Sequence, residues 1–140
     1  MSVAHPRLNA MTVDVEDYFQ VSAFESVFTP DDWPEIPLRV EDNTNRLLDI
    51  FAENNVKSTF FTLGWVGKRC PSLIKRIVDE GHELASHGLN HRRATTMDRH
   101  AFVEDVQTSK AILEDAGGVA IKGYRAPSFS VNDTNQWVYE

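Results

Sequence analysis

Residues 83–91 read Glu83-Leu84-Ala85-Ser86-His87-Gly88-Leu89-Asn90-His91 and form the most informative stretch of the chain. Its first four residues predict a short strand that runs directly into His87. His87 and His91 are four positions apart, a spacing that places two side chains on one face of a helical turn. Neutral imidazole is a good ligand for zinc and similar ions. The stretch therefore predicts a pair of metal ligands at a strand end, although a chance histidine pair on an exposed helix is the alternative for these residues alone.

A second strand end carries carboxylates. Residues 8–15 are apolar and β-branched and predict a buried strand, and acidic residues follow at its end: Asp14, Glu16 and Asp17. Alternation along an extended chain puts Asp14 and Glu16 on the same side. One carboxylate would bind the ion and another would take a proton from water. Two histidines and one carboxylate leave a coordination position open, as in catalytic zinc sites. Taken alone, the acidic triplet also fits a solvated turn.

Strands and helices alternate along the rest of the chain. Apolar runs predict strands over residues 57–63 and 119–124, and amphipathic patterns predict helices over residues 40–54, 71–79 and 98–116. Residues 18–37 contain several aromatic side chains and three prolines, which is typical of a long loop with its own packing. This alternation predicts an α/β fold with a parallel sheet.

A third strand end carries an arginine. The predicted strand 119–124 leads into Arg125-Ala126-Pro127. Because the sites of parallel α/β folds lie at the carboxyl ends of the strands, we expect Asp14, His87 and Arg125 to converge. An arginine can hold a carboxylate with two hydrogen bonds, so Arg125 is expected to orient Asp14 as a base and keep it off the metal. A plain exit from strand to loop is the alternative for Arg125.

Composition excludes several classes of protein. The 140 residues suffice for a single domain, and the net charge of −7 argues against a nucleic-acid surface. Cys70 is the single cysteine, so no internal disulfide can form. Neither an apolar leader nor a run long enough to span a membrane is present in the sequence, which predicts a cytoplasmic location.

Three motifs together resemble those of a known family. They are Thr12-Val13-Asp14-Val15-Glu16-Asp17, Ser86-His87-Gly88-Leu89-Asn90-His91 and Gly123-Tyr124-Arg125-Ala126-Pro127. In order and spacing they are similar to the first three motifs of polysaccharide deacetylases, the carbohydrate esterase family 4 or nodulation-deacetylase homology group. The segment Asp-Val-Glu-Asp-Tyr-Phe, residues 14–19, is similar to the corresponding motif of a subgroup associated with bacterial exopolysaccharide export. The resemblance covers roughly residues 8–130.

The resemblance implies part of a distorted (β/α) barrel that removes N-acetyl groups from an amino-sugar polysaccharide with a divalent metal, for which zinc is expected. On this reading His87 and His91 bind the metal, Asp14 is the general base and Arg125 tethers it. The family's motif has two adjacent aspartates, but this chain has Val15 in the second place. The ligand then shifts to Glu16 or Asp17, and Glu16 is favoured because it lies on the Asp14 side of the strand. Substrate contacts are expected at Asp17, Tyr18 and Pro127.

The family's later motifs, which include its general-acid histidine, are expected beyond residue 130. Residues 1–140 are therefore expected to be one polysaccharide deacetylase-like domain shortened at its C-terminal end. Open sheet edges would then favour self-association. Two further functions stay open at this point. One is a catalytically incomplete carbohydrate- or partner-binding module that uses the aromatic loop between Tyr18 and Trp33, and the other is a hydrolase of a non-sugar amide.

Overall fold

The computed structural model describes residues 9–140, so the predictions that concern residues 1–8, including the start of the first strand, lie outside the described residues. A parallel sheet of order β1-β2-β3 forms the centre, with β1 at Thr12–Val15, β2 at Thr59–Thr62 and β3 at Glu83–Ser86. Asp14 pairs in register with Phe61, and Phe61 with Ala85. The α/β class with parallel strands is thereby confirmed.

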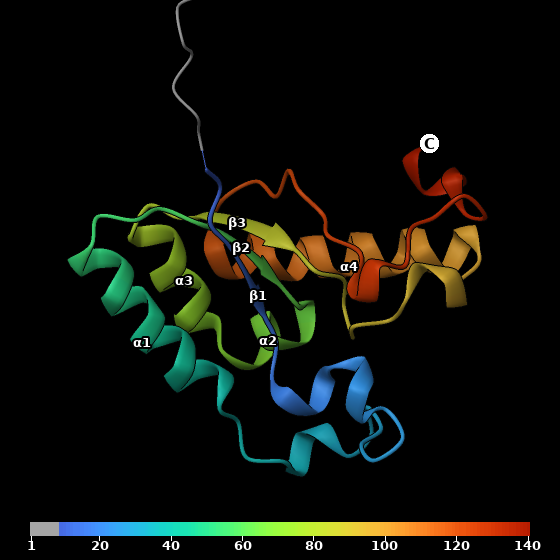
Figure 1. Ribbon diagram of the computed structural model, residues 1–140, viewed down its shortest axis with the longest axis horizontal. Helices are drawn as coiled ribbons and strands as arrows, with labels where there is room; N and C mark the ends of the chain where they lie inside the picture. Colours follow the sequence, from blue (N-terminus) through green and yellow to red (C-terminus); the bar gives the residue numbers. More distant parts are fainter. Residues whose placement is uncertain (1–8) are drawn as a thin grey trace, which may run out of the picture.

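Within residues 9–140, four α-helices pack along one face of this sheet (Figure 1). They are α1 at Val40–Glu53, α2 at Gly64–Arg69, α3 at Pro71–Asp79 and α4 at Arg99–Gly117. Their starts have identifiable causes, because Pro71 opens α3 and the Asp98 carboxylate caps α4 by accepting from the amide of Ala101. The predicted helices 40–54, 71–79 and 98–116 agree with the structure to within a residue or two.

The core lies between the helices and one face of the sheet. Val15, Phe60 and Leu84 are buried on this face, against side chains such as Leu48 of α1 and Ile77 of α3. Burial of these side chains supplies the main stabilisation, about 1.5–3 kcal/mol for each. On the opposite face, Thr12, Asp14 and Phe61 are only partly covered, and the guanidinium of Arg125 lies 3.9 Å from the Phe61 ring centroid. This second face therefore carries Asp14 and Arg125 near the carboxyl edge of the sheet.

Helix α2 was not predicted, because two of its six residues are glycines. The structure gives these glycines a packing role. A Cβ at Gly64 would lie 3.0 Å from Cα of Ser109, and one at Gly67 would lie 2.8 Å from Cδ2 of Leu113. Glycine allows α2 to approach α4 closely, and this gain outweighs the low helix propensity of glycine.

The predicted strand over residues 119–124 is wrong. The segment returns beside β3 (Figure 1) but forms only an isolated bridge between Ser86 and Tyr124. The reason is that side chains of α4 form hydrogen bonds with the backbone amide and carbonyl of Ile121, which a strand would use for pairing. The Glu114 carboxylate accepts from the Ile121 amide at 2.9 Å, and Lys110 Nζ donates to the Ile121 carbonyl at 3.1 Å.

Strand β1 is an edge strand that pairs with β2 alone among the described residues. The prediction of a buried first strand is wrong for one of its faces, because Thr12 and Asp14 point away from the core and are exposed, whereas Val15 on the core face is buried. Self-association through this edge stays a prediction. Within residues 9–140, no helix combines the length and apolar character needed to cross a bilayer.

The aromatic loop between β1 and α1 packs on itself as predicted. It contains three short 3-10 helices, at Tyr18–Gln20, Ser22–Phe24 and Trp33–Glu35. Phe19 and Trp33 are buried, with their ring centroids 6.0 Å apart, and both contact Trp65 of α2. The loop is thus anchored to the domain beside the carboxyl end of β1.

Candidate metal centre

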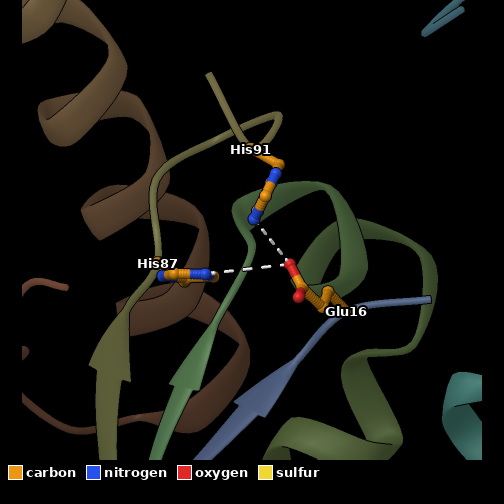
Figure 2. A group of neighbouring side chains, drawn as sticks. All are labelled: Glu16, His87 and His91. Carbon is orange, nitrogen blue, oxygen red and sulfur yellow. Dashed lines mark ion pairs between the residues drawn. The ribbon is translucent and has the colours of Figure 1, made fainter. Parts of the chain in front are cut away.

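Three side chains converge at the carboxyl edge of the sheet (Figure 2). Glu16 follows β1, while His87 follows β3 and His91 lies four residues further along. Oε2 of Glu16 lies 2.9 Å from Nε2 of His91 and 3.7 Å from Nε2 of His87. One ligand atom from each residue falls within 4.8 Å of the others, which is a suitable arrangement for one metal ion.

The donor set fits a divalent cation for a second reason. Oε2 of Glu16 is buried and has no hydrogen-bond partner among residues 9–140, because its 2.9 Å approach to Nε2 of His91 lacks hydrogen-bond geometry. A buried carboxylate oxygen without a partner carries a large desolvation cost. A cation bound between Glu16 and the two histidines would remove that cost. The structure favours Glu16 over Asp17 as the carboxylate ligand.

The hydrogen bond made by its other ring nitrogen orients His87 as a ligand. Nδ1 lies 2.8 Å from the carbonyl oxygen of Arg125, and because a carbonyl can only accept, Nδ1 carries the proton. Nε2 then presents its lone pair to the site. Burial also lowers the pKa of His87, the largest of the effects that act on it, which favours the neutral imidazole that a metal requires.

The two histidines do not lie on a helical turn, which corrects the prediction from their spacing. Residues 87–93 form no regular element, and both Gly88, at φ 83°, and His91, at φ 53°, have left-handed backbone conformations. The chain doubles back, which brings the two imidazole centroids to 5.2 Å. Glycine adopts this conformation at no steric cost, whereas His91 needs support from its surroundings.

The predicted ion pair between Asp14 and Arg125 is present, but a single hydrogen bond joins the two side chains in place of the two that were predicted. Nη1 of Arg125 donates to Oδ1 of Asp14 at 2.6 Å, and Nη2 donates to the Thr12 hydroxyl at 3.0 Å. The other oxygen of Asp14 faces the metal ligands, 4.0 Å from Nε2 of His87. Arg125 therefore fixes one oxygen of Asp14 and leaves the other turned toward the centre.

Asp17 has another task in the fold. Its carboxylate is buried and accepts hydrogen bonds from the amides of Arg39 and Val40, at 2.7 and 2.9 Å, where α1 begins. It also accepts from the amide of Tyr18. A negative charge at a helix start is favourable. We assign Asp17 to holding α1 against β1, and its predicted contact with substrate stays a prediction.

Tyr18 and Pro127 do not line the cavity that contains both histidines. Tyr18 packs edge-on against Phe19 and Phe28 and borders an adjoining groove next to α1, whose wall also includes Asp14 and Glu16, while Pro127 is fully buried. A role in substrate binding is untested for both.

A cavity of about 490 Å³ opens over the centre. Its wall includes three residues that the sequence did not single out: Ser22, Ser128 and Phe129. The Ser22 and Ser128 hydroxyls are 2.6 Å apart and join the aromatic loop to the segment after Arg125. Ser128 and Phe129 both have a φ above 50°, and Phe129 is fully exposed. Periodicity could not reveal them, because Ser22 lies in the 3-10 helix Ser22–Phe24 and the other two lie in the 3-10 helix Pro127–Phe129, and three residues are too few to show a repeat.

Comparison with known proteins finds one family along most of the chain. Residues 21–140 match the family Polysaccharide deacetylase. A peptidoglycan-N-acetylglucosamine deacetylase of Bacillus cereus is 31% identical over 103 residues, which is 74% of this chain and 36% of the relative. A chitooligosaccharide deacetylase of Rhizobium leguminosarum bv. trifolii is 36% identical over 83 residues, or 59% of this chain and 39% of the relative. The chain thus spans less than half the length of these relatives.

Solved structures agree with this similarity. A polysaccharide deacetylase structure from Mycobacterium smegmatis matches with a TM-score of 0.74 and 28% identity, covering 92% of this chain and 46% of the other. A T48 deacetylase solved with substrate matches with a TM-score of 0.70 and 29% identity, covering 92% of this chain and 53% of the other. The arrangement of strands and helices is therefore that of part of a (β/α) barrel.

Proposed function

We propose that this chain, which belongs to the polysaccharide deacetylase family, carries the metal ligands and the general base of an enzyme that removes N-acetyl groups from an amino-sugar polysaccharide. The observation that supports this most directly is the joint placement of two sets of residues. Glu16, His87 and His91 form a three-ligand group, and Asp14 lies beside it, tied to Arg125. Ligands and base thus meet at one cavity, although they come from three distant parts of the chain.

The residues divide the chemistry between them. A divalent cation at Glu16, His87 and His91 would supply a Lewis acid that polarises the acetamide carbonyl and acidifies water. The free oxygen of Asp14 takes the proton of the attacking water. Arg125 holds Asp14 in position through Oδ1 and prevents its rotation onto the ligand group. A separate acid must protonate the departing amine, and none of the residues assigned to this centre has that role.

Zinc is the proposed ion, because two imidazoles and one carboxylate with an open position are typical of catalytic zinc. An N-acetylated polysaccharide is the proposed substrate, supported by the similarity to a peptidoglycan-N-acetylglucosamine deacetylase and a chitooligosaccharide deacetylase. The resemblance of residues 14–19 to the export-associated subgroup supports an exopolysaccharide as the polymer.

The first experiment measures metal content. The protein is loaded with zinc, dialysed and analysed by elemental analysis, together with the variants His87→Ala and His100→Ala. His100 is an exposed histidine near the start of α4 and serves as the matched control. We expect stoichiometric zinc in the wild type and in His100→Ala, and loss of zinc in His87→Ala. Unchanged zinc in His87→Ala would refute the centre.

The second experiment measures turnover with a substrate panel. Acetate release from chitooligosaccharides supports the proposed function, whereas formate or ammonia release from non-sugar amides would replace it with the other hydrolase. Glycan binding by metal-free protein without acetate release would instead favour the aromatic loop as a binding module. Phe19 and Trp33 of that loop pack inward against Trp65, whereas its Tyr18 and Phe24 are exposed, so this measurement decides between the two functions.

A further inference from the structure

The loop that carries the two histidines is held by its backbone. Gly88 and Leu89 lie between the ligands, and their carbonyl groups accept hydrogen bonds from the first amides of α2. The Gly64 amide donates to the Gly88 carbonyl at 2.9 Å, and the Trp65 amide donates to the Leu89 carbonyl at 3.0 Å. The start of α2 thus fixes one side of the loop.

Helix α4 and β3 hold the other side with side chains. The Ser109 hydroxyl donates to the Gly88 carbonyl at 2.9 Å, and Oδ2 of Asp105 accepts from the Leu89 amide at 3.0 Å. The Ser86 hydroxyl accepts from the Gly88 amide at 3.1 Å. Every backbone donor and acceptor of Gly88 and Leu89 therefore has a partner, which is what a buried non-helical loop requires.

Asp105 is the least expected of these partners. It is a carboxylate only 6% exposed on a helix whose other buried side chains are apolar or small, and burial raises its pKa. Among residues 9–140 it has no ion-pair partner, and its one hydrogen bond is the bond from Leu89. Burying a carboxylate for the sake of the fold alone would be unfavourable.

The Asp105 carboxylate also touches the loop directly. A Cβ at Gly88 would lie 3.1 Å from Oδ2 of Asp105, so the carboxylate lies against the left-handed turn that separates the two ligands. The Leu89 amide has no acceptor other than Asp105 in the described chain, whereas the Gly88 carbonyl has two donors, Ser109 and Gly64. The turn therefore depends more on Asp105 than on Ser109.

We propose that Asp105 is a positioning residue of the metal centre, which sets the separation of His87 and His91 by holding the Leu89 amide from α4. The inference rests on the proposed function, because it assumes that the histidines bind a metal. It adds α4 to the elements that determine metal affinity. Partners that orient metal ligands commonly change affinity by about 10–100-fold when they are removed.

The test follows cobalt(II) binding by titration and by visible absorption, which reports the coordination geometry. Asp105→Ala removes the acceptor, Asp105→Asn keeps an acceptor oxygen, and Ser109→Ala removes one of two donors to the Gly88 carbonyl. Glu104→Gln, at an exposed neighbouring carboxylate on α4, is the matched control for the loss of one charge. Circular dichroism confirms that each variant is folded.

We expect Asp105→Ala to weaken cobalt binding by about tenfold or more and to shift its absorption bands. Asp105→Asn and Glu104→Gln should retain the wild-type affinity and spectrum, and Ser109→Ala should show a smaller loss with a detectable shift. If Asp105→Ala does not fold, Asp105→Leu, which fills a similar volume and also lacks an acceptor, decides the question, and wild-type affinity and spectrum in it overturn the inference.

Folded Asp105→Ala with wild-type affinity and spectrum would overturn the inference and leave the proposed function intact. Equal losses in Asp105→Asn and Asp105→Ala would also overturn it, because charge and not the hydrogen bond would then matter. Absence of cobalt binding in the wild type would instead refute the proposed function, and the inference with it.

Discussion

Arg125 holds His87 through its backbone and Asp14 through its side chain. Its carbonyl oxygen lies 2.8 Å from Nδ1 of His87, and its guanidinium lies 2.6 Å from Oδ1 of Asp14. One residue thus orients a metal ligand and the proposed base together. Because only the second contact involves the side chain, substitution of Arg125 separates the two roles.

Arg125→Ala is expected to retain metal and lose turnover. The carbonyl bond to His87 survives the substitution, so zinc affinity should change by less than about threefold, whereas misplacement of Asp14 should lower the rate of deacetylation by about 100-fold. Zinc titration and acetate release measure the two effects. Turnover by Arg125→Lys should remain low, since an ammonium group cannot donate to Asp14 and Thr12 in the geometry of the planar guanidinium. Loss of zinc in Arg125→Ala would contradict this division of roles.

Glu16 and Asp17 are expected to give opposite phenotypes although they are neighbours. Glu16→Gln should weaken zinc binding with little effect on stability, because Glu16 serves the ligand group. Asp17→Ala should lower the free energy of unfolding by about 1–3 kcal/mol, because it leaves the amides of Arg39 and Val40 without their acceptor. Urea unfolding and zinc titration of both variants test this, and an Asp17→Ala protein with normal stability but no zinc would reverse the assignment of the ligand.

Gly64→Ala is expected to destabilise the protein, although alanine is the better helix former. The added methyl would meet Cα of Ser109 at 3.0 Å and Cδ1 of Leu89 at 2.9 Å, and relief of such overpacking costs about 1–3 kcal/mol. Because the Gly64 amide binds the Gly88 carbonyl, zinc affinity should fall as well. Thermal unfolding and zinc titration provide the measurements. Ser72→Ala, at an exposed position on α3, should change neither quantity, and a stabilised Gly64→Ala would show that α2 and α4 are not in close contact.

Acid is expected to weaken the fold in part through His82. Nδ1 of this buried side chain accepts a hydrogen bond from the Ser58 amide at 3.2 Å, and its ring packs on Phe60. Burial lowers the pKa of His82 from the usual 6.5. The native state therefore binds the proton less readily than the unfolded state. The contribution of His82 to stability is complete above about pH 6.5 and falls as the pH drops below that value.

Urea unfolding between pH 8 and pH 5 measures this effect. His82→Asn, which places an amide oxygen near the position of Nδ1, should be less stable overall but should lose less stability on acidification than the wild type. His100→Asn should show the wild-type dependence, since His100 is exposed. A wild-type slope in His82→Asn would assign the acid sensitivity to other groups.

The sequence by itself determined the elements with strong local signals. Amphipathic periodicity and end signals identified helices α1, α3 and α4, and the apolar runs identified the three strands of the parallel sheet. The convergence of the site residues was also predictable, because the carboxyl ends of β1 and β3 lie at one edge of the parallel sheet and Arg125 follows the bridge beside β3, whereas the roles of these residues stay predictions. Asp14, Glu16, His87, His91 and Arg125 all border the same cavity.

Tertiary structure decided what depends on contacts distant in sequence. The His87–His91 turn is not helical because α2 and α4 bind its backbone, and α2 itself forms around glycines whose value lies in close packing against α4. Residues 119–124 form no strand because the side chains of Glu114 and Lys110 form hydrogen bonds with the backbone amide and carbonyl of Ile121. Alternation along the strand favoured Glu16 over Asp17 as the carboxylate ligand, but only the position of α1 revealed that Asp17 accepts from the first amides of that helix. Local patterns specify which residues favour a helix, a strand or a metal, but hydrogen bonds between distant elements decide where their side chains point.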